Sequence, residues 1–124
     1  MIKDRRVTVR AIPQPSDLNV NGNIFGGWVL SQMDLAGGDV ASRRAGGPVA
    51  TVAIEGMTFH YPIEVGDVIS VYAEVAKVGR TSITVKIDVF AERGIARDLH
   101  QVTEGTYIFV AVDENGRPVA VKPI

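Results

Sequence analysis

Hydrophobic and polar positions change their period twice along the chain. Residues 6–12 alternate, which predicts a short strand with one wet face, and residues 13–23 are dense in Pro, Asn, Asp and Gly, which predicts a loop. From about residue 25 to residue 44 the period becomes helical. The hydrophobic positions that carry this period are Val29, Met33, Ala36 and Val40. The AGG run at 45–47 and Pro48 predict the end of the helix.

After Pro48 the period is two, which predicts four further strands. They are expected at 49–61, 67–78, 82–92 and 101–113. A tight turn is expected at 78–82, a looser segment around Gly94, and a turn at 113–116. In the strand at 82–92 the positions predicted to face inward are Ile83, Val85, Ile87, Val89 and Ala91.

The predicted order is therefore one strand, one helix and four strands. Consecutive strands with short links favour an antiparallel sheet, and the single helix must cover its hydrophobic face. The fold class is α+β, with one long central helix wrapped by the sheet. The helix also carries Ile24, Phe25, Trp28, Leu30 and Leu35. One sheet covers only one side of such a helix, so a second subunit is expected on the other side.

Composition narrows the class of protein. The 124 residues suggest one domain, 1–124, and the net charge of −1 argues against nucleic acid or an anionic membrane as a main partner. The sequence has no cysteine, which excludes thiolate chemistry and disulfides. His60 and His100 are too few and too isolated for a metal cluster, so no metal is expected. No hydrophobic run approaches the ~20 residues that span a bilayer, and the first ten residues lack a signal-peptide core, so a cytoplasmic protein is expected.

Asp34 lies in the middle of the predicted hydrophobic helix. Aspartate is a poor helix former, and a dry, unpaired carboxylate costs several kcal/mol. A structural explanation would give Asp34 a partner cation or a water-filled cavity. Arg43 and Arg44 could supply this cation only from another chain or by bending back toward Asp34. A functional explanation would make Asp34 a catalytic acid or base.

Gly26 and Gly27 stand where the helix begins, after Asn23. Free N–H groups at a helix N-terminus attract anions and polarise carbonyl oxygens, and glycine lets a ligand approach the backbone. A plain Asn cap with a glycine turn is the alternative explanation. Asn23 and Asp34 are eleven residues apart, roughly 16 Å along a helix. If they cooperate, each comes from a different subunit of a two-fold dimer.

Several motifs resemble one family over nearly the whole chain. They are SDLNVNGNIFGGWVLSQMDLAGG, VATVAIEGMTF, PIEVGDVISVYAEVAKVGRTSI and YIFVAVDENGRP. The chain resembles the hotdog-fold acyl-CoA thioesterases of the YciA-like type. The resemblance implies a hotdog fold with a five-stranded antiparallel sheet around one helix. It further implies dimers with a continuous sheet that assemble into a trimer of dimers, and hydrolysis of acyl-CoA to free acid and coenzyme A without another cofactor.

The resemblance also implies roles for particular residues. Asp34 matches the catalytic acid, Asn23 the polar residue before the turn, and Gly26 and Gly27 the backbone that polarises the thioester carbonyl. The VGRTS segment matches a region near the coenzyme A phosphates. Its residues of interest are Arg80, Thr81 and Ser82. An arginine in a turn is otherwise a solvated charge.

Thr51 and Glu55 are weaker substrate-binding candidates on the strand expected beside the helix. Their spacing of four places them on one face of a regular strand. Structural pairing is the alternative for Glu55.

Two mechanisms and two other functions remain open at this point. Asp34 either deprotonates a water or attacks the thioester directly. A hotdog dehydratase or hydratase would need a catalytic His paired with an acid in the helix region, and this helix has none. A non-catalytic acyl-CoA-binding module is the other alternative.

Overall fold

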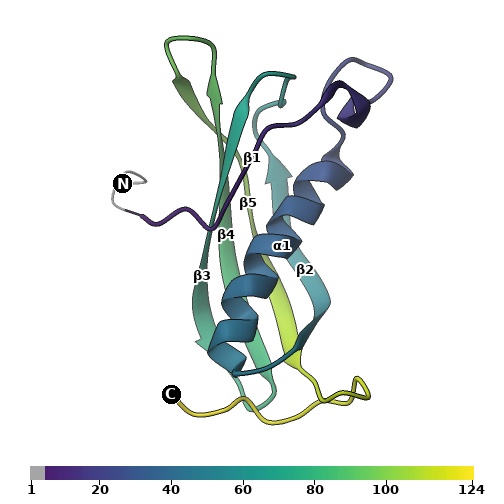
Figure 1. Cartoon of the computed structure of the whole chain (residues 1–124), viewed down its shortest axis with the longest axis vertical. Helices are drawn as coiled ribbons and strands as arrows, with labels where there is room; N and C mark the ends of the chain where they lie inside the picture. Colours follow the sequence, from purple (N-terminus) through teal and green to yellow (C-terminus); the bar gives the residue numbers. More distant parts are fainter. Residues whose placement is uncertain (1–4) are drawn as a thin grey trace.

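The computed structural model describes residues 5–124 and has one helix packed against one face of a five-stranded antiparallel sheet (Figure 1). This confirms the α+β prediction. The elements are β1 (Val9–Ala11), a 3-10 turn η2 (Pro15–Asp17), α1 (Gly26–Ala45), β2 (Val49–Phe59), β3 (Val68–Val78), β4 (Ser82–Arg93) and β5 (Asp98–Ala111). Among the described residues no helix is both long and hydrophobic enough to cross a membrane.

The strands lie side by side in the order β1-β3-β4-β5-β2. β1 is shorter than the alternation at 6–12 predicts, because only Val9, Arg10 and Ala11 pair with β3. Thr8 adds one backbone hydrogen bond to Val71. β1 and β2 are therefore the two edges of the sheet. β1 is a short edge and β2 a long one, and edge strands offer unpaired backbone groups to a partner.

The β4–β5 connection corrects the looser segment expected around Gly94. Pairing continues to Arg93 and Asp98, so β5 begins three residues earlier than predicted and the connection is a tight hairpin. Gly94 and Arg97 both have positive φ, 73° and 58°. A turn of this kind depends on left-handed backbone, which hydrophobic periodicity does not report.

The core lies between α1 and the sheet. All five positions predicted to face inward on β4 are fully buried. The helical stripe is buried at Val29, Met33 and Ala36 and half-buried at Val40. Gly37 is also buried, and a Cβ there would lie 2.9 Å from the side chains of Ile87 and Phe109. The glycine therefore lets the middle of the helix approach the sheet closely.

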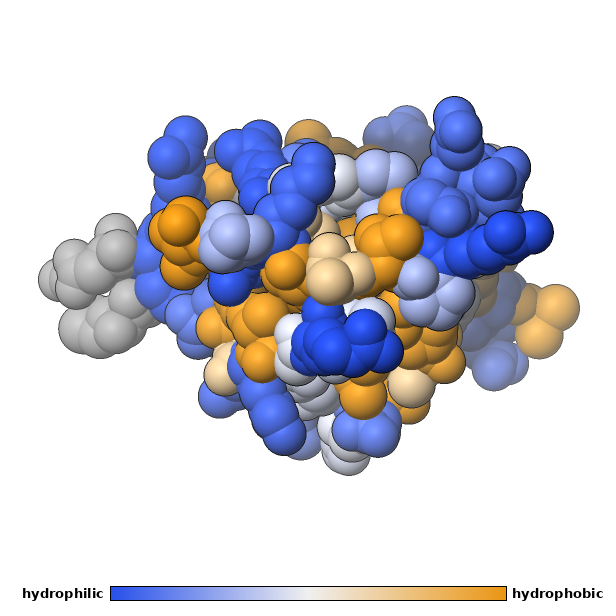
Figure 2. Space-filling view, turned by 90° about the horizontal axis from the view of Figure 1, so that it is seen from below, coloured by the Kyte–Doolittle hydropathy of each residue, from blue (hydrophilic) through white to orange (hydrophobic). Residues whose placement is uncertain are grey.

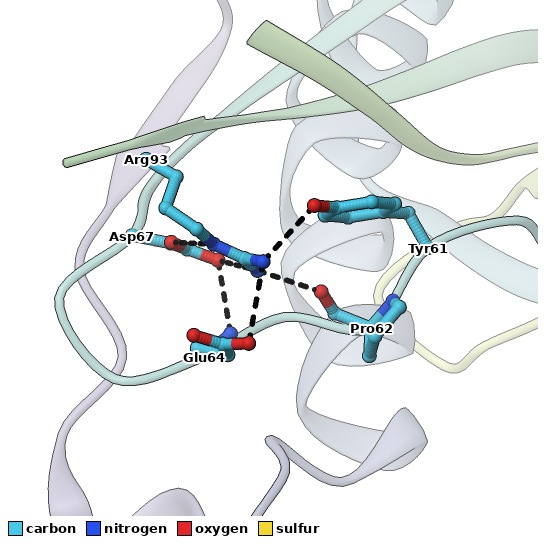
Figure 3. Close-up of polar contacts among 5 residues, drawn as sticks. All are labelled: Tyr61, Pro62, Glu64, Asp67 and Arg93. Carbon is cyan, nitrogen blue, oxygen red and sulfur yellow. Dashed lines mark hydrogen bonds and ion pairs between the residues drawn. The ribbon is translucent and has the colours of Figure 1, made fainter. Parts of the chain in front are cut away.

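The loop after β2 is fastened to β4 by one arginine (Figure 3). Arg93 donates through Nε and Nη2 to both carboxylate oxygens of Asp67, at 2.8 and 2.7 Å, and Asp67 is 1% exposed. Arg93 also donates to the carbonyl of Pro62 and the hydroxyl of Tyr61, and lies 3.3 Å from Glu64. The hydrogen bond to Asp67 raises the pKa of Arg93. We call this set of contacts the Arg93 clamp.

Asp67→Ala is expected to lower the free energy of unfolding by about 3 kcal/mol, because it leaves a largely buried guanidinium without its carboxylate. Urea denaturation measures the loss. The control is Arg43→Ala, which breaks the exposed pair with Asp39 and is expected to cost about 0.5 kcal/mol or less. A loss in Asp67→Ala no larger than in the control would contradict the assignment of the clamp as a stabilising contact.

Candidate active site

Asp34 points away from the core and is held from the neighbouring strand. Its Oδ1 accepts a hydrogen bond from Thr51 Oγ1 at 2.6 Å, and the residue is exposed in the single chain. A hydroxyl donor fixes one oxygen of the carboxylate and leaves the other free to accept a proton. This arrangement suits a general base or a nucleophile, whose reacting oxygen must be oriented and open.

The cations considered as partners for Asp34 lie elsewhere. Arg43 pairs with Asp39 one turn away, and Arg44 donates to the backbone carbonyl of Lys122 at 2.8 Å. The explanation of Asp34 by a cation that bends back from its own chain is therefore wrong. Thr51, a neutral donor, takes that place.

Tyr107 braces the helical turn that precedes Asp34. Its hydroxyl donates to the carbonyl of Leu30 at 2.8 Å, from a fully buried position on β5. Burial raises the pKa of Tyr107 to about 12, and the charge of Asp34 contributes to the rise. The phenol therefore stays protonated and keeps donating to the helix.

The start of α1 is open. Phe25 occupies the N-cap position without a side-chain cap, and the first turn holds no acidic residue. The hypothesis that Asn23 caps this helix is therefore wrong. Asn23 lies two residues earlier. Its amide donates to the side-chain oxygen of Asn19, and its carbonyl accepts a hydrogen bond from the amide of Asn19. Gly26 and Gly27 are exposed, so their amides are available to a ligand.

The two halves of the predicted site do not meet within one chain. Gly26 and Asp34 lie eight residues apart on a continuous helix, roughly 12 Å along its axis. Around Asp34, α1 and the edge strand β2 expose large hydrophobic side chains, with Leu35 62% exposed. We call this surface the α1–β2 face. Its exposed hydrophobic residues are Phe25, Leu35, Val52, Ile54 and Phe59.

A known family model fits this chain. The thioesterase superfamily model matches residues 21–96, which include α1 with Asp34 and most of the sheet. The chain belongs to the thioesterase superfamily.

Individual relatives agree over almost the full length. The chain is 44% identical over 115 residues to the acyl-CoA thioester hydrolase YciA of Salmonella typhimurium, covering 90% of this chain and 86% of that protein. It resembles the solved hexameric thioesterase of Yersinia pestis with a TM-score of 0.91 and 40% identity, covering 98% of each chain. It also resembles a hexameric broad specificity acyl-coenzyme A thioesterase, solved as an aspartate-to-alanine mutant, with a TM-score of 0.90 and 42% identity, covering 96% and 88% of the two chains. The resemblance to the YciA-like type is confirmed.

In this superfamily member Thr51 and Glu55 do not share a face. β2 has a register shift between Thr51 and Ala53, so Thr51 opposes Phe109 while Glu55 opposes Thr106. Opposed residues point to the same side of a sheet. Thr51 therefore faces α1, and Glu55 faces away from it. The prediction of one shared face is wrong because the bulge inverts the alternation.

Arg80 and Thr81 lie in the tight β3–β4 turn that the sequence predicts, and Ser82 begins β4. Arg80 is exposed, and its carbonyl accepts a hydrogen bond from the amide of Val121 in the C-terminal segment. The turn lies at the end of the sheet that carries the C-terminus of α1, and the start of α1, at Gly26, lies at the other end (Figure 1). Within residues 5–124 no group of three or more His, Asp or Glu side chains could hold a metal ion.

Two features of the site were not found from the sequence. The contact of Tyr107 with Leu30 joins residues 77 positions apart, and Tyr107 gave only the signal of an alternating strand position. The sequence predicts Thr51 as a substrate contact, whereas its observed partner is Asp34. Local periodicity predicts faces but not which side chains meet across elements.

Tyr107→Phe is expected to flatten the loss of stability between pH 10 and 12. An unfolded tyrosine ionises near pH 10, whereas folded Tyr107 has a pKa of about 12. Between these values the unfolded state has lost a proton that the folded state keeps, so the free energy of unfolding falls as pH rises. Urea denaturation at pH 9 and pH 11 measures the slope. A parental and a variant slope of equal size would contradict the raised pKa.

Proposed function

We propose that residues 1–124 form one catalytic domain that hydrolyses acyl-CoA thioesters to a free carboxylic acid and coenzyme A. The observation that carries this proposal is the Asp34 carboxylate, oriented by Thr51 and exposed beside large hydrophobic side chains of α1 and β2. A carboxylate placed there gains nothing for packing. The acyl-CoA thioester hydrolases and thioesterases among the relatives support the same reaction.

The active site is shared between two protomers. The α1–β2 face of one protomer packs against that of its partner, with the two β2 edges continuing one sheet. The two-fold axis brings Asp34 of one chain to the Asn23–Gly27 segment of the other, and it makes two equal sites. Three such dimers form a hexamer, as the hexameric thioesterase relatives suggest.

The reaction begins with the thioester carbonyl at the amides of Gly26 and Gly27. These donors stabilise the negative charge that develops on oxygen in the transition state. Asp34 of the partner protomer takes a proton from a water, whose oxygen attacks the carbonyl carbon. The carbon–sulfur bond then breaks, and the coenzyme A thiolate leaves and takes up a proton. A direct attack by Asp34, which passes through a mixed anhydride, is the alternative route. Asn23 orients the water or the thioester.

Coenzyme A binds along the β3–β4 turn of a protomer other than the one that supplies Gly26, because the turn and the start of α1 lie at opposite ends of one chain. Arg80 donates to a phosphate, and Thr81 and Ser82 contact the same segment of the ligand. Figure 2 shows this end of the molecule. Hydrophobic residues lie near its centre, and hydrophilic residues surround them and partly cover them. A nucleotide is suited to such a surface, because its phosphates meet the hydrophilic rim. Glu55, which faces away from α1, is the weakest candidate for substrate contact.

The partners and setting follow from this function. The enzyme uses no cofactor beyond the coenzyme A of its own substrate, binds no nucleic acid and works in the cytoplasm. A dehydratase or hydratase is less well supported, because α1 carries no histidine. A non-catalytic acyl-CoA-binding module would not need an oriented carboxylate.

Asp34→Asn is expected to keep the fold and to lower kcat by ~10²–10⁴. The asparagine Oδ1 still accepts from Thr51, but it is neither a base nor a nucleophile. Release of free thiol from acyl-CoA measures kcat, and thermal melting checks the fold. Asp39→Asn, an exposed change on the same helix, is the matched control and keeps parental kcat. Near-parental kcat in folded Asp34→Asn would falsify the assignment.

Mixing two inactive variants tests the shared site. Asp34→Asn and Asn23→Ala homodimers each lack one half of both sites, whereas a mixed dimer has one intact site. Random exchange at equal amounts makes half of the dimers mixed, so roughly a quarter of parental activity is expected. Exchange is confirmed by mass spectrometry of a tagged chain. Exchanged subunits that stay inactive would place the site within a single chain.

A further inference from the structure

The last residues of the chain lie between the end of α1 and the β3–β4 turn. Figure 1 shows this segment in yellow, running back across the end of the molecule where α1 ends. The amide of Val121 donates to the carbonyl of Arg80 at 2.8 Å, and the amide of Lys122 donates to the carbonyl of Ala45 at 3.3 Å. Two consecutive amides therefore join two elements that are far apart in the sequence. We call residues 119–122 the C-terminal latch.

Side chains also fasten the C-terminal latch to α1. Arg44 Nη1 donates to the carbonyl of Lys122 at 2.8 Å, and Lys122 Nζ donates to the carbonyl of Gly46 at 3.0 Å. A Cβ at Gly46 would lie 2.9 Å from Lys122 Cδ, so the lysine stem occupies space that only a glycine leaves open. Cations stabilise the carbonyl groups at the end of a helix. The latch is therefore anchored where α1 ends.

The C-terminal latch is anchored to the core and to β5 as well. The Val121 side chain is half-buried and packs against the hydrophobic core. The amide of Val119 donates to the carbonyl of Ala111 at 2.8 Å, and the amide of Ala111 donates to the carbonyl of Thr81 at 2.8 Å. The end of β5 therefore holds Thr81, and the latch holds its neighbour Arg80.

The β3–β4 turn combines a tight backbone with an exposed arginine side chain. The amide of Gly79 donates to the carbonyl of Ser82 at 2.8 Å and closes the turn. Arg80 is exposed, and within residues 5–124 its guanidinium takes part in no ion pair. Arg80 is therefore placed by its backbone, whose carbonyl is bonded to Val121.

We propose that the C-terminal latch positions Arg80 for coenzyme A, with the Val121 amide as the positioning group, an inference that rests on the proposed function. The latch fixes the backbone from which the Arg80 guanidinium projects. A preordered backbone lowers the conformational entropy that is lost when the guanidinium binds a phosphate. The latch acts on the binding of the nucleotide and not on the chemical step at Asp34.

Val121→Pro removes the amide donor and tests this role. KM for butyryl-CoA is expected to rise about threefold to tenfold, the range for one lost hydrogen bond, while kcat stays at the parental value. KM for S-butyrylpantetheine, which has no nucleotide, is expected to stay unchanged. Val121→Ala, the conservative variant, keeps the amide and is expected to lower the melting temperature but not to change KM. An unchanged KM for butyryl-CoA in folded Val121→Pro, or an equal rise for both substrates, would overturn the proposal.

A double variant separates positioning of Arg80 from a general loosening of the fold. Arg80→Ala removes the guanidinium and is expected to raise KM for butyryl-CoA. If the latch acts through this guanidinium, adding Val121→Pro to Arg80→Ala raises KM no further. Effects of the two changes that multiply in the double variant would overturn the proposal.

Arg44→Ala tests the other anchor and decides the matter if Val121→Pro does not fold, as circular dichroism would show. Loss of the bond to the Lys122 carbonyl is expected to raise KM for butyryl-CoA about twofold or more, and to add nothing in Arg80→Ala. Arg43→Ala is the matched control: it removes the same charge one residue away, from a side chain that pairs with Asp39, and keeps the parental KM. Equal KM values in Arg44→Ala and Arg43→Ala would overturn the proposal.

Calorimetry with coenzyme A separates this inference from the proposed function. Val121→Pro is expected to bind coenzyme A about threefold to tenfold more weakly than the parental protein. Equal dissociation constants would overturn the role of the latch even where hydrolysis is established. Weaker binding by Val121→Pro, in a protein whose parental form hydrolyses no butyryl-CoA, would instead reject the thioesterase function and keep the latch. A parental protein that binds no coenzyme A would overturn both.

Discussion

The structure depends on the covering of a five-stranded sheet by a single helix. α1 must lie close to β3 and β4 to seal the core, and Gly37 permits that approach. The helix has hydrophobic side chains on more sides than one sheet can reach, so the α1–β2 face stays uncovered in a single chain. The same geometry sets the active site, because the residues that point away from the sheet are those that a partner can meet. Packing and catalysis therefore share one helix and use its opposite sides.

The edge strand β2 contributes to both tasks through its irregularity. The bulge after Thr51 turns this residue toward α1, where it reaches Asp34, while Glu55 turns outward. A regular strand would have placed both side chains on the same side. Bulges are common near active sites for this reason, since they re-aim one side chain without moving the rest of the strand.

Sequence periodicity predicted the order of elements, the inward face of β4 and the bounds of α1 to within one residue. It did so because each depends on burial, which repeats with the period of the backbone. The length of β1, the tight hairpin at Gly94 and the bulge in β2 were missed, because they depend on pairing partners and on left-handed backbone. At the site, Asp34 was identified because a carboxylate contradicts its hydrophobic surroundings. Tyr107 agrees with its surroundings as a buried aromatic residue, so nothing in the sequence distinguished its contact with Leu30.

The Arg93 clamp keeps the loop beside the helix start separate from the turn that positions the Asp34 carboxylate. It fastens the loop at 60–67 to β4, and the amide of Ile24, just before α1, donates to the carbonyl of Ile63, so this loop is held without using the helical turn that carries Asp34. Side chains of the loop at 60–67 can therefore change size during evolution without shifting the Asp34 carboxylate. A fold arranged in this way can diversify in what it accepts while its chemistry stays constant, and a lineage can drift from one substrate to the next through active intermediates.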